Sequence, residues 1–412
     1  MQKLIVQPLK ESGISTTIVI DALDECKDEE PASAILHVLG QLVSGIPKAK
    51  FLVTGRPEPR IQEGFRLPLL ADSTGVFVLH EVEPSQVDND TRLFFKHKFL
   101  EVARRRRDLD DWPSKEQLDI LCKRAAGLFV YAVATVKFVA KQSTSPRKQL
   151  DLLLQSPESS VREGKMKVKA DTTLDSLYAS ILRGAFGDEE DPDNDPKVRS
   201  VLGTMILAPN PLSPSTIATL LGFDIDEVFP LLSSAQSLLT LQEDIDHPVQ
   251  PFHKSFPDFI TDRDRCTNQR FHISLSHHHP QLLARCFHIM DRTLEKNICK
   301  LPEVIANSDV KDLKERIERY INPALRYACR SWHTHLVGRR AQSANAREIT
   351  SALHRFLEGN FLFWLEVLSV LGAVSSSFDA LQAAVGWSEV CQGSIFDAMP
   401  EFFRPDSGTT YS

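Results

Sequence analysis

The chain has 412 residues, of which 42% are hydrophobic and 25% are charged, a composition typical of globular proteins with roughly two to four domains. Its net charge of −7 and its pI near 6.0 exclude a general electrostatic attraction to nucleic acid or to anionic membranes. The seven cysteines are scattered and contain no CxxC pair, which argues against a disulfide framework and favours a reducing, cytoplasmic location.

The first 85 residues follow an α/β pattern. Residues 16–20 form a β-branched run, residues 50–55 form a second, and residues 75–82 form a third. Apolar residues at helical spacing fill residues 31–43, between the first two runs. Strand, helix and strand in this order predict a βαβ crossover in a parallel sheet.

From about residue 86 the pattern becomes mainly helical. Asp90 or Thr91 would cap the first helix of this region. The predicted inner face of that helix consists of Leu93, Phe94, Phe95, Phe99 and Leu100. A capping box at residues 114–117 predicts the start of the next helix.

Residues 198–260 predict a small module of helices and strands. Ser213 is the expected N-cap of one helix, with Pro214 in its first turn, and Asp224 is the expected cap of the next. A turn at residues 243–248 then joins two short predicted strands. Helix, turn, helix and hairpin form a winged-helix pattern.

These patterns divide the chain into five parts. We expect the C-terminal part of an α/β domain over residues 1–85 and a helical domain over residues 86–165. A winged-helix domain follows over residues 170–265, then a second helical domain over residues 270–400 and a tail over residues 401–412. The predicted fold class is therefore α/β with a parallel sheet, followed by a mainly α region. The winged helix is not expected to bind DNA, because its second helix carries Asp224, Asp226 and Glu227 but no Lys or Arg.

Three carboxylates follow the first predicted strand: Asp21, Asp24 and Glu25. Open α/β sheets bind ligands at the carboxyl ends of their strands. Carboxylates this close repel one another unless a cation lies between them, so the pattern predicts a metal site. The alternative is a solvated loop in which Asp24 acts as a helix cap.

Thr54 and Arg56 end the neighbouring strand, where Arg56 would contact either a phosphate or one of the carboxylates of Asp21 and Glu25.

The segments "IVIDALDEC" and "KFLVTGRPEPRI" resemble the Walker B and sensor segments of NACHT-type STAND NTPases. The chain is similar in particular to the fungal heterokaryon-incompatibility and NLR-like group. The resemblance continues through "PFHKSFPDFITD", "HPQLLARCFHIM" and "YACRSWHTHL" and covers nearly the whole chain. It implies that residues 1–85 are the C-terminal part of a NACHT nucleotide-binding domain, with a partial P-loop NTPase sheet.

The resemblance also implies roles for individual residues. Asp21 would bind Mg²⁺, and Glu25 with Asp24 would serve slow, regulatory hydrolysis of the nucleotide. Arg56 would be the sensor, and His253 would reach the β-phosphate of ADP, so Mg²⁺ and ATP or ADP are the implied cofactors. The residues alone leave a second interpretation open, in which His253 caps a turn at the edge of the core. The implied function is ATP/ADP-regulated oligomerisation in innate immunity or non-self recognition.

Such proteins need a phosphate-binding loop of the form GxxxxGK[ST], and none of the eighteen glycines stands in that pattern. We therefore expect a chain truncated before the Walker B strand and before any C-terminal repeats. We expect such a chain to be unable to bind nucleotide alone and to be inactive, although the family it resembles hydrolyses NTPs slowly, so its standing as an enzyme is uncertain. The alternative function is a non-catalytic interaction fragment. Its expected partners are proteins, either itself or longer relatives, and neither nucleic acid nor membranes are expected.

Three further signals favour structural roles. Residues 103–108, "ARRRRD", end a predicted helix, where cations suit the helix dipole, so a solvated patch is favoured over a nucleic-acid or lipid site. Residues 276–279, "SHHH", lack metal-ligand spacing to Cys266 and Cys286 and favour a helix start. Residues 361–374 are apolar, but a membrane-spanning helix needs about 20 residues, so we expect a packed helix.

Overall fold

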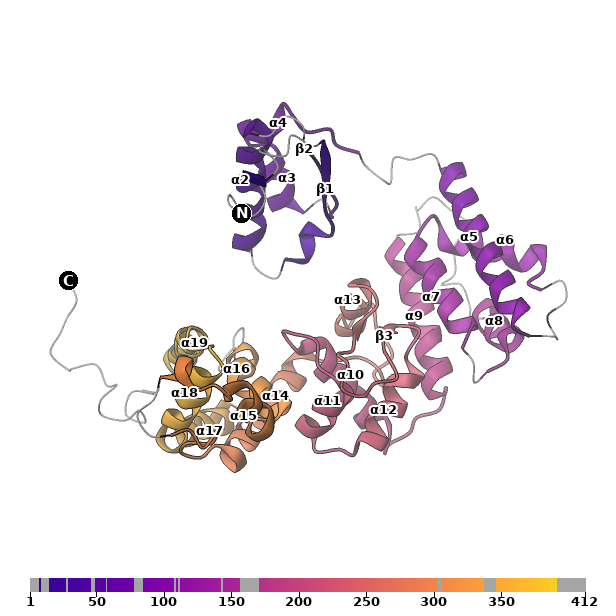
Figure 1. Ribbon diagram of the computed structural model, residues 1–412. Coiled ribbons are helices and arrows are strands. Elements are labelled where there is room, and N and C mark those ends of the chain that lie inside the picture. The colour runs from indigo at the N-terminus through magenta and orange to yellow at the C-terminus, as the bar shows by residue number, and fades with distance from the viewer. Residues whose placement is uncertain are drawn as a thin grey trace. The chain divides into compact units, whose positions relative to one another are not determined.

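The computed structural model describes residues 7–8, 15–26, 29–45, 49–56, 58–77, 84–106, 109, 112–141, 144–155, 170–302, 306–336 and 346–390. Over these residues the chain is mostly helical, with one small parallel sheet and one short antiparallel pair of strands. It divides into two units, residues 1–83 and residues 84–412 (Figure 1).

The N-terminal unit contains two parallel strands joined by a helix. Its elements are β1 (Thr16–Ile20), the 3₁₀ turn η2 (Leu23–Glu25), α2 (Glu29–Gly45), β2 (Ala49–Val53), α3 (Pro59–Phe65) and α4 (Pro68–Ala71). β1 pairs with β2 in parallel, in a register that runs from Thr16 opposite Ala49 to Ile20 opposite Val53. Both strands therefore end at the same edge of the sheet (Figure 1), which confirms the predicted βαβ crossover.

One face of this sheet packs against helices and the other is exposed. Ile20 and Phe51 contact a buried cluster that includes Leu36 of α2. On the opposite face, Val19 and Leu52 are 60% and 55% exposed. Parallel sheets are usually covered on both faces, so this apolar face is a surface suited to further packing.

The third predicted strand does not form over the residues described. Residues 75–77 have no regular secondary structure, and residues 78–82 lie outside the described residues. Val76 and Phe77 are 76% and 77% exposed. Apolar and β-branched side chains favour a strand only where a neighbouring strand and a packed face are present, and residues 75–77 have neither.

The C-terminal unit begins with a group of helices: α5 (Pro84–Arg104), α6 (Lys115–Ala125), α7 (Phe129–Val139), α8 (Pro146–Gln155) and α9 (Ala170–Phe186). The predicted capping box at the start of α6 is confirmed. The Ser114 hydroxyl accepts a hydrogen bond from the Gln117 N–H at 3.2 Å. The Gln117 side chain in turn accepts one from the Ser114 N–H at 2.9 Å. These bonds satisfy two N–H groups that the helix itself cannot pair.

The start of α5 differs from the prediction. The helix begins at Pro84, a residue type that suits the first helical position because it has no N–H to satisfy. Asp90 and Thr91 therefore lie inside the helix and do not cap it. The Thr91 hydroxyl donates instead to the Val87 carbonyl at 2.8 Å, one turn earlier.

The buried face of α5 is narrower than predicted. Phe95 and Phe99 are fully buried and stack with their ring centroids 5.6 Å apart. Leu93 and Leu100 are 67% and 46% exposed, so their prediction as inner-face residues is wrong. Leu93 and Leu100, seven apart, share one side of the helix, and Phe95 and Phe99, four apart, share another, which is the side that faces the core.

The next segment contains α10 (Asp195–Leu207), α11 (Pro214–Leu221), α12 (Ile225–Ser234), β3 (Leu239–Thr240), β4 (Gln250–Pro251) and α13 (Ser255–Thr261). Ser213 caps α11 as predicted, because its hydroxyl accepts from the Thr216 N–H at 3.2 Å, and Pro214 lies in the first turn. β3 and β4 form the predicted hairpin with shorter strands. An isolated bridge joins Leu212 to Val249.

The last segment contains α14 (Leu275–Thr293), the 3₁₀ turns η4 (Asn307–Asp309) and η5 (Trp332–His335), α15 (Leu313–Tyr320), α16 (Pro323–Ser331), α17 (Ala346–Gly359), α18 (Phe361–Val370) and α19 (Ser376–Val390). The helix start predicted at residues 276–279 is confirmed by α14. Trp332, Phe356 and Trp364 pack edge to face in the core, with centroids 5.5–6.1 Å apart. No helix in the described part of the chain has both the length and the apolar character that crossing a membrane requires.

A buried ion pair fixes the junction between α9, α10 and the segment before α14. Arg270 and Asp195 are 7% and 6% exposed and pair through two hydrogen bonds, Nε to Oδ2 at 2.8 Å and Nη2 to Oδ1 at 2.9 Å. Arg270 also donates to the Gly187 carbonyl at 3.0 Å. The hydrogen bonds from Arg270 hold the pKa of the Asp195 carboxyl below its ordinary value. One side chain therefore closes the acidic loop between α9 and α10.

Loss of this ion pair should destabilise the C-terminal unit. We expect Arg270→Met to lower the free energy of unfolding by about 3–5 kcal/mol, because the Asp195 carboxylate stays buried without its partner. Tryptophan fluorescence during urea unfolding measures the change, since all four tryptophans lie in this unit. The control is Arg263→Met, which replaces an exposed arginine nearby and should change stability by less than about 0.5 kcal/mol.

The same pair gives the expected pH dependence. Because the pKa of Asp195 is lower in the folded chain, its contribution to stability is complete above the ordinary carboxyl pKa of 3.8 and is lost as the pH falls through the lower native value. The difference between wild type and Arg270→Met should therefore shrink in acid. Equal effects of the Arg270 and Arg263 substitutions would contradict the assignment.

Candidate functional site

The carboxyl ends of β1 and β2 are joined by hydrogen bonds centred on Thr54. The Thr54 N–H donates to the Ile20 carbonyl and the Leu23 N–H donates to the Thr54 carbonyl, each at 2.9 Å. The Thr54 hydroxyl accepts from the Ala22 N–H at 2.9 Å and donates to the Asp21 carboxylate. The side chain of Thr54, directly after β2, therefore positions both the backbone and the carboxylate that follow β1.

Ala22 makes a sharp bend directly after this strand. Its φ of 53° and ψ of 50° place it in the left-handed region, which costs an L-residue about 1–2 kcal/mol. The hydrogen bond from its N–H to Thr54 helps to hold this conformation. The bend leaves Asp21 exposed on the strand edge, while Leu23 and Asp24 are buried in the 3₁₀ turn.

Asp24 holds the residues that follow β2. Its side chain is buried, and Oδ1 accepts from the Arg56 N–H at 3.1 Å while Oδ2 lies 3.6 Å from Arg56 Nε. The Asp24 carbonyl accepts from Arg60 Nη2 at 3.1 Å. A Cβ added to Gly55 would lie 3.4 Å from Asp24 Oδ1, so the loop passes close to the carboxylate. Arg56 thus pairs with Asp24, and its side chain remains 44% exposed at the strand edge.

The carboxylates at this edge fit a magnesium ion unequally. Asp21 and Glu25 are exposed, whereas both oxygens of Asp24 lie against Arg56. Mg²⁺ takes oxygen ligands and keeps several waters when one or two carboxylates bind it. Asp21 and Glu25 are each open to such an ion, whereas Asp24 fits a positioning role. Among the residues described, no three His, Cys, Asp or Glu side chains form a group that could hold a metal ion.

His253 lies between β4 and α13 in the C-terminal unit and is held by Ser255. Its Nδ1 lies 2.7 Å from the Ser255 Oγ and 3.2 Å from the Ser255 backbone nitrogen. The Ser255 Oγ lies 2.7 Å from the hydroxyl of Tyr178 on α9. The Phe256 N–H donates to the His253 carbonyl at 3.1 Å. His253 therefore caps the turn that begins α13, as its structural interpretation predicts.

A lysine of α7 brings positive charge close to this turn. Lys137 Nζ lies 3.7 Å from the centroid of the Phe252 ring, next to His253 in the chain. Lys141 Nζ lies 3.4 Å from the Ser234 carbonyl at the end of α12. Burial lowers the pKa of both lysines. The helical group and the helix–hairpin segment are thus joined by half-buried cations.

The structure brings most of the predicted site residues together. Four of the five lie at the strand edge of the N-terminal unit: Asp21, Asp24, Glu25 and Arg56. The fifth, His253, lies in the C-terminal unit. No pattern in the sequence indicates a role for Tyr178, which lies 77 residues from Ser255 in the chain. Only tertiary packing of α9 on α13 makes that contact.

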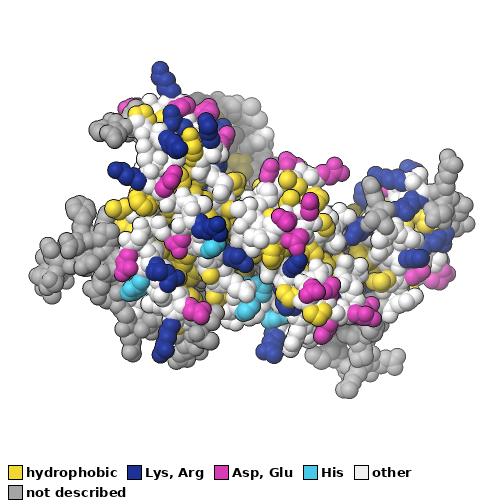
Figure 2. Space-filling model, turned by 90° about the horizontal axis from the view of Figure 1, so that it is seen from below, with side chains coloured by type: hydrophobic (Ala, Val, Ile, Leu, Met, Phe, Trp, Pro, Cys, Tyr) yellow, Lys and Arg dark blue, Asp and Glu magenta, His cyan; other side chains and the backbone are white. Residues whose placement is uncertain are grey.

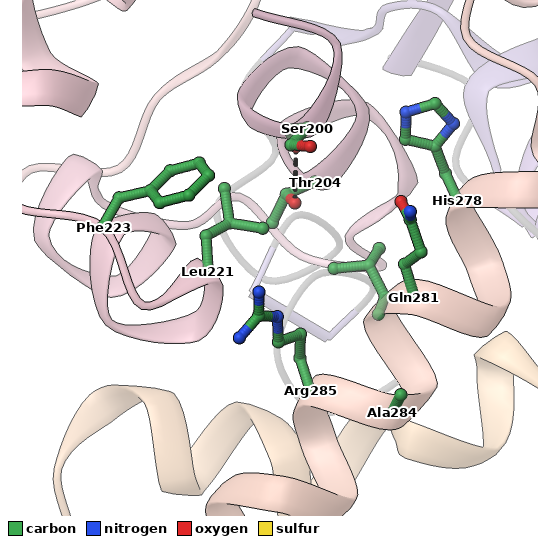
Figure 3. Close-up of a pocket in the computed structure, with 9 residues that line it drawn as sticks. Ser200, Thr204, Leu221, Phe223, His278, Gln281, Ala284 and Arg285 are labelled. Atoms are coloured by element: carbon green, nitrogen blue, oxygen red, sulfur yellow. Dashed lines mark hydrogen bonds between the residues drawn. The ribbon is translucent and has the colours of Figure 1, made fainter. Parts of the chain in front are cut away.

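A cavity of about 220 Å³, absent from the sequence-based predictions, lies between α10, the end of α11 and α14. It is lined by Ser200, Thr204, Leu221, Phe223, His278, Gln281, Leu282, Ala284 and Arg285. Figure 3 shows Arg285 extending from α14 toward Leu221, with the Thr204 hydroxyl bonded to the Ser200 carbonyl on α10. Burial lowers the pKa of His278, which packs against Gly203, where a Cβ would lie 2.6 Å from the ring.

Charge is mixed over the surface of the C-terminal unit. On the face seen in Figure 2, acidic and basic side chains alternate, and Lys and Arg gather over the end that carries α5–α8. The first turn of α12 carries Asp226 and Glu227, and Glu227 pairs with Lys197 of α10. Acidic residues at the start of α12 oppose insertion of this helix into DNA.

Comparison with known proteins places the strand edge in context. Residues 1–56 match a sequence family described as "Nephrocystin 3, N-terminal", and these residues contain β1, α2, β2 and the four strand-edge site residues. The chain is 22% identical over 398 residues to "Vegetative incompatibility protein HET-E-1" of Podospora anserina, covering 91% of this chain and 27% of that protein. The chain thus spans about a quarter of the length of this curated relative. No solved structure gives a significant match.

The role of Thr54 can be tested without nucleotide. Thr54→Val keeps the shape of the side chain but removes the acceptor for the Ala22 N–H, so we expect a local loss of about 1–2 kcal/mol. Hydrogen exchange with mass spectrometry should show faster exchange in peptides covering residues 15–26. The control is Thr74→Val, which removes a hydroxyl bonded to the Leu70 carbonyl at 2.7 Å in the same unit and should leave residues 15–26 unchanged. Unchanged exchange in Thr54→Val would refute the role of its hydroxyl.

Proposed function

We propose that this chain is part of a nucleotide-controlled signalling switch of the NACHT type that takes part in non-self recognition. The observation that carries the proposal is the strand edge at which two parallel strands deliver carboxylates and an arginine. Ligands of open α/β sheets bind at such edges. The resemblance of the surrounding segments to Walker B and sensor motifs supports a nucleotide as the ligand.

Each residue of the edge has a proposed task. Asp21, oriented by Thr54, would hold Mg²⁺, which neutralises phosphate charge and orients the nucleotide when bound. The exposed Glu25 carboxylate would orient an attacking water during slow hydrolysis. Asp24 fixes Arg56 through the Arg56 N–H and guanidinium, so that Arg56 would donate to a phosphate oxygen.

His253 would be the nucleotide contact of the C-terminal unit. It lies in the segment that we propose to be a winged-helix domain, residues 170–265, flanked by helical domains at residues 86–165 and 270–400. A contact from His253 to the β-phosphate of ADP would favour one arrangement of the domains over another. The switch would then control self-association, with further copies or longer relatives as protein partners.

The curated relative supports the biological setting. HET-E-1 is named a vegetative incompatibility protein, and the similarity covers 91% of this chain. We propose that this chain serves recognition of the same kind. Because it spans 27% of that relative, the function of the whole relative is not transferred with the site.

A second function, protein binding without nucleotide, is favoured by the uncovered face of the β1–β2 sheet. Val19 and Leu52 are more than half exposed on that face. The sequence also contains no GxxxxGK[ST] loop, whose amides and lysine bind phosphates in P-loop NTPases. In this case another protein segment would cover this face of the sheet.

Titration of the 412-residue chain with ADP and ATP, with and without Mg²⁺, separates the two functions. The switch function predicts Mg²⁺-dependent binding that is about tenfold to a hundredfold weaker in Asp21→Asn and in Arg56→Gln, because each loses a charge-assisted contact to the Mg²⁺-nucleotide. The control is Asp72→Asn, an exposed acid of the same unit after α4, which should bind as wild type does. Isothermal titration calorimetry measures all four chains.

The outcomes differ clearly. A nucleotide affinity that changes neither when Mg²⁺ is removed nor in Asp21→Asn would contradict a nucleotide site at the strand edge. A folded chain that binds neither nucleotide would support the protein-binding function, and capture of a second copy or of a longer relative would then be the next measurement.

A further inference from the structure

We propose that the cavity between α10, the end of α11 and α14 binds a small organic monocarboxylate with an apolar, ring-sized body, and that Arg285 pairs with the carboxylate of this ligand. The cavity lies within the C-terminal unit and shares no residue with the strand edge or with His253. The proposal is therefore independent of nucleotide binding.

The guanidinium of Arg285 is the charged group of this cavity. It extends from α14 toward Leu221 at the end of α11 (Figure 3). A Cβ added to Gly222 would lie 3.5 Å from Arg285 Nη1, so the guanidinium lies against the end of that helix. Within the part of the chain that the structure describes, no residue forms a hydrogen bond or an ion pair with Arg285. Its N–H donors are thus open to a ligand.

The end of α11 does not use these donors. Arginine near a helix C-terminus can bond to the last carbonyls of the helix. Here the Gly222 N–H donates to the carbonyls of Ala218 and Thr219, and the Phe223 N–H donates to the Ala218 carbonyl at 3.0 Å. Gly222 allows this closure because its φ of 70° lies in the left-handed region, which glycine adopts readily. The helix dipole therefore attracts the guanidinium without occupying it.

The charge of the cavity selects a monoanion. None of the lining residues that the structure describes is Asp, Glu or Lys. His278 donates from Nδ1 to the Ser274 carbonyl 3.0 Å away, and burial lowers the pKa of this histidine, so its ring is neutral at neutral pH. One guanidinium balances one carboxylate, whereas a phosphate dianion would keep an unbalanced negative charge.

The walls and the volume select the body of the ligand. Leu221 and Leu282 are 7% and 3% exposed, and Phe223 adds an aromatic ring to the lining. A cavity of roughly 150 Å³ accommodates one benzene molecule. The cavity of about 220 Å³ present here therefore admits such a ring together with a carboxylate. Ala284 and Arg285 are exposed, so a ligand can enter from solvent beside α14.

Benzoate is the probe, because it joins one ring to one carboxylate. We expect the 412-residue chain to bind it with a dissociation constant on the order of 1 mM, a weak affinity suited to so small a ligand. Benzyl alcohol keeps the ring without the charge, acetate keeps the carboxylate without the ring, and phenyl phosphate carries a different anion. Each should bind at least about tenfold more weakly than benzoate. Saturation-transfer NMR of the ligands measures the affinities.

Two substitutions of Arg285 test its role. Arg285→Met should weaken benzoate binding about tenfold to a hundredfold, because the carboxylate loses a charge-assisted contact, and should leave benzyl alcohol binding unchanged. Arg285→Lys keeps the charge without the planar fork and should cause a smaller loss. The control is Arg292→Met, which replaces an exposed arginine of the same helix outside the cavity and should bind benzoate as wild type does.

The outcomes decide the site and its ligand class separately. Absence of benzoate binding at about 10 mM, or equal benzoate binding by Arg285→Met and Arg292→Met, would overturn the site. Equal affinities of wild type for benzoate and benzyl alcohol would overturn the role of the guanidinium, and tighter binding of phenyl phosphate would overturn the choice of a carboxylate. If Arg285→Met does not fold, the comparison of Arg285→Lys with Arg292→Met decides the same question.

Discussion

The parallel pairing of β1 with β2 is the constraint on which the candidate site depends. Because α2 returns the chain to the start of β2, both strands end at one edge, and an antiparallel pair would have placed Thr54 at the opposite edge from Asp21. Thr54 extends the pairing past the last ladder residue through its N–H to Ile20 and its carbonyl to Leu23. The backbone register thereby fixes which side chains meet.

Helix caps were predicted correctly from the sequence, because they depend on residues close together in the chain. The Ser114 capping box and the Ser213 cap involve residues three apart, so their patterns in the sequence were sufficient. The buried face of α5 was predicted less well, because Leu93 and Phe95 are equally apolar and the packing of α6 and α7 decides which is covered. The prediction of a strand over residues 75–77 failed for the same kind of reason, since a strand forms only where a neighbouring strand pairs with it.

The candidate site shows the same division. That Asp21 and Arg56 would lie at the same edge of the sheet followed from two strand ends and a crossover. That Arg56 would pair with Asp24 did not, because this contact depends on the left-handed bend at Ala22. The link from Tyr178 to Ser255 spans 77 residues, and no periodicity or motif encodes it. Sequence patterns therefore located the charged groups, and tertiary packing determined their partners.

A ligand can shift a conformational equilibrium only as far as it binds one state more tightly than another. The strand edge and His253 belong to different units, and under the proposed function each would bind the nucleotide more tightly in one state than in another. Both are ordered by their own hydrogen bonds, Asp21 by Thr54 and His253 by Ser255, which lowers the cost of ordering side chains when the ligand binds. Under the proposed function, more of the binding free energy then remains to favour the nucleotide-bound state, which a nucleotide-controlled switch requires.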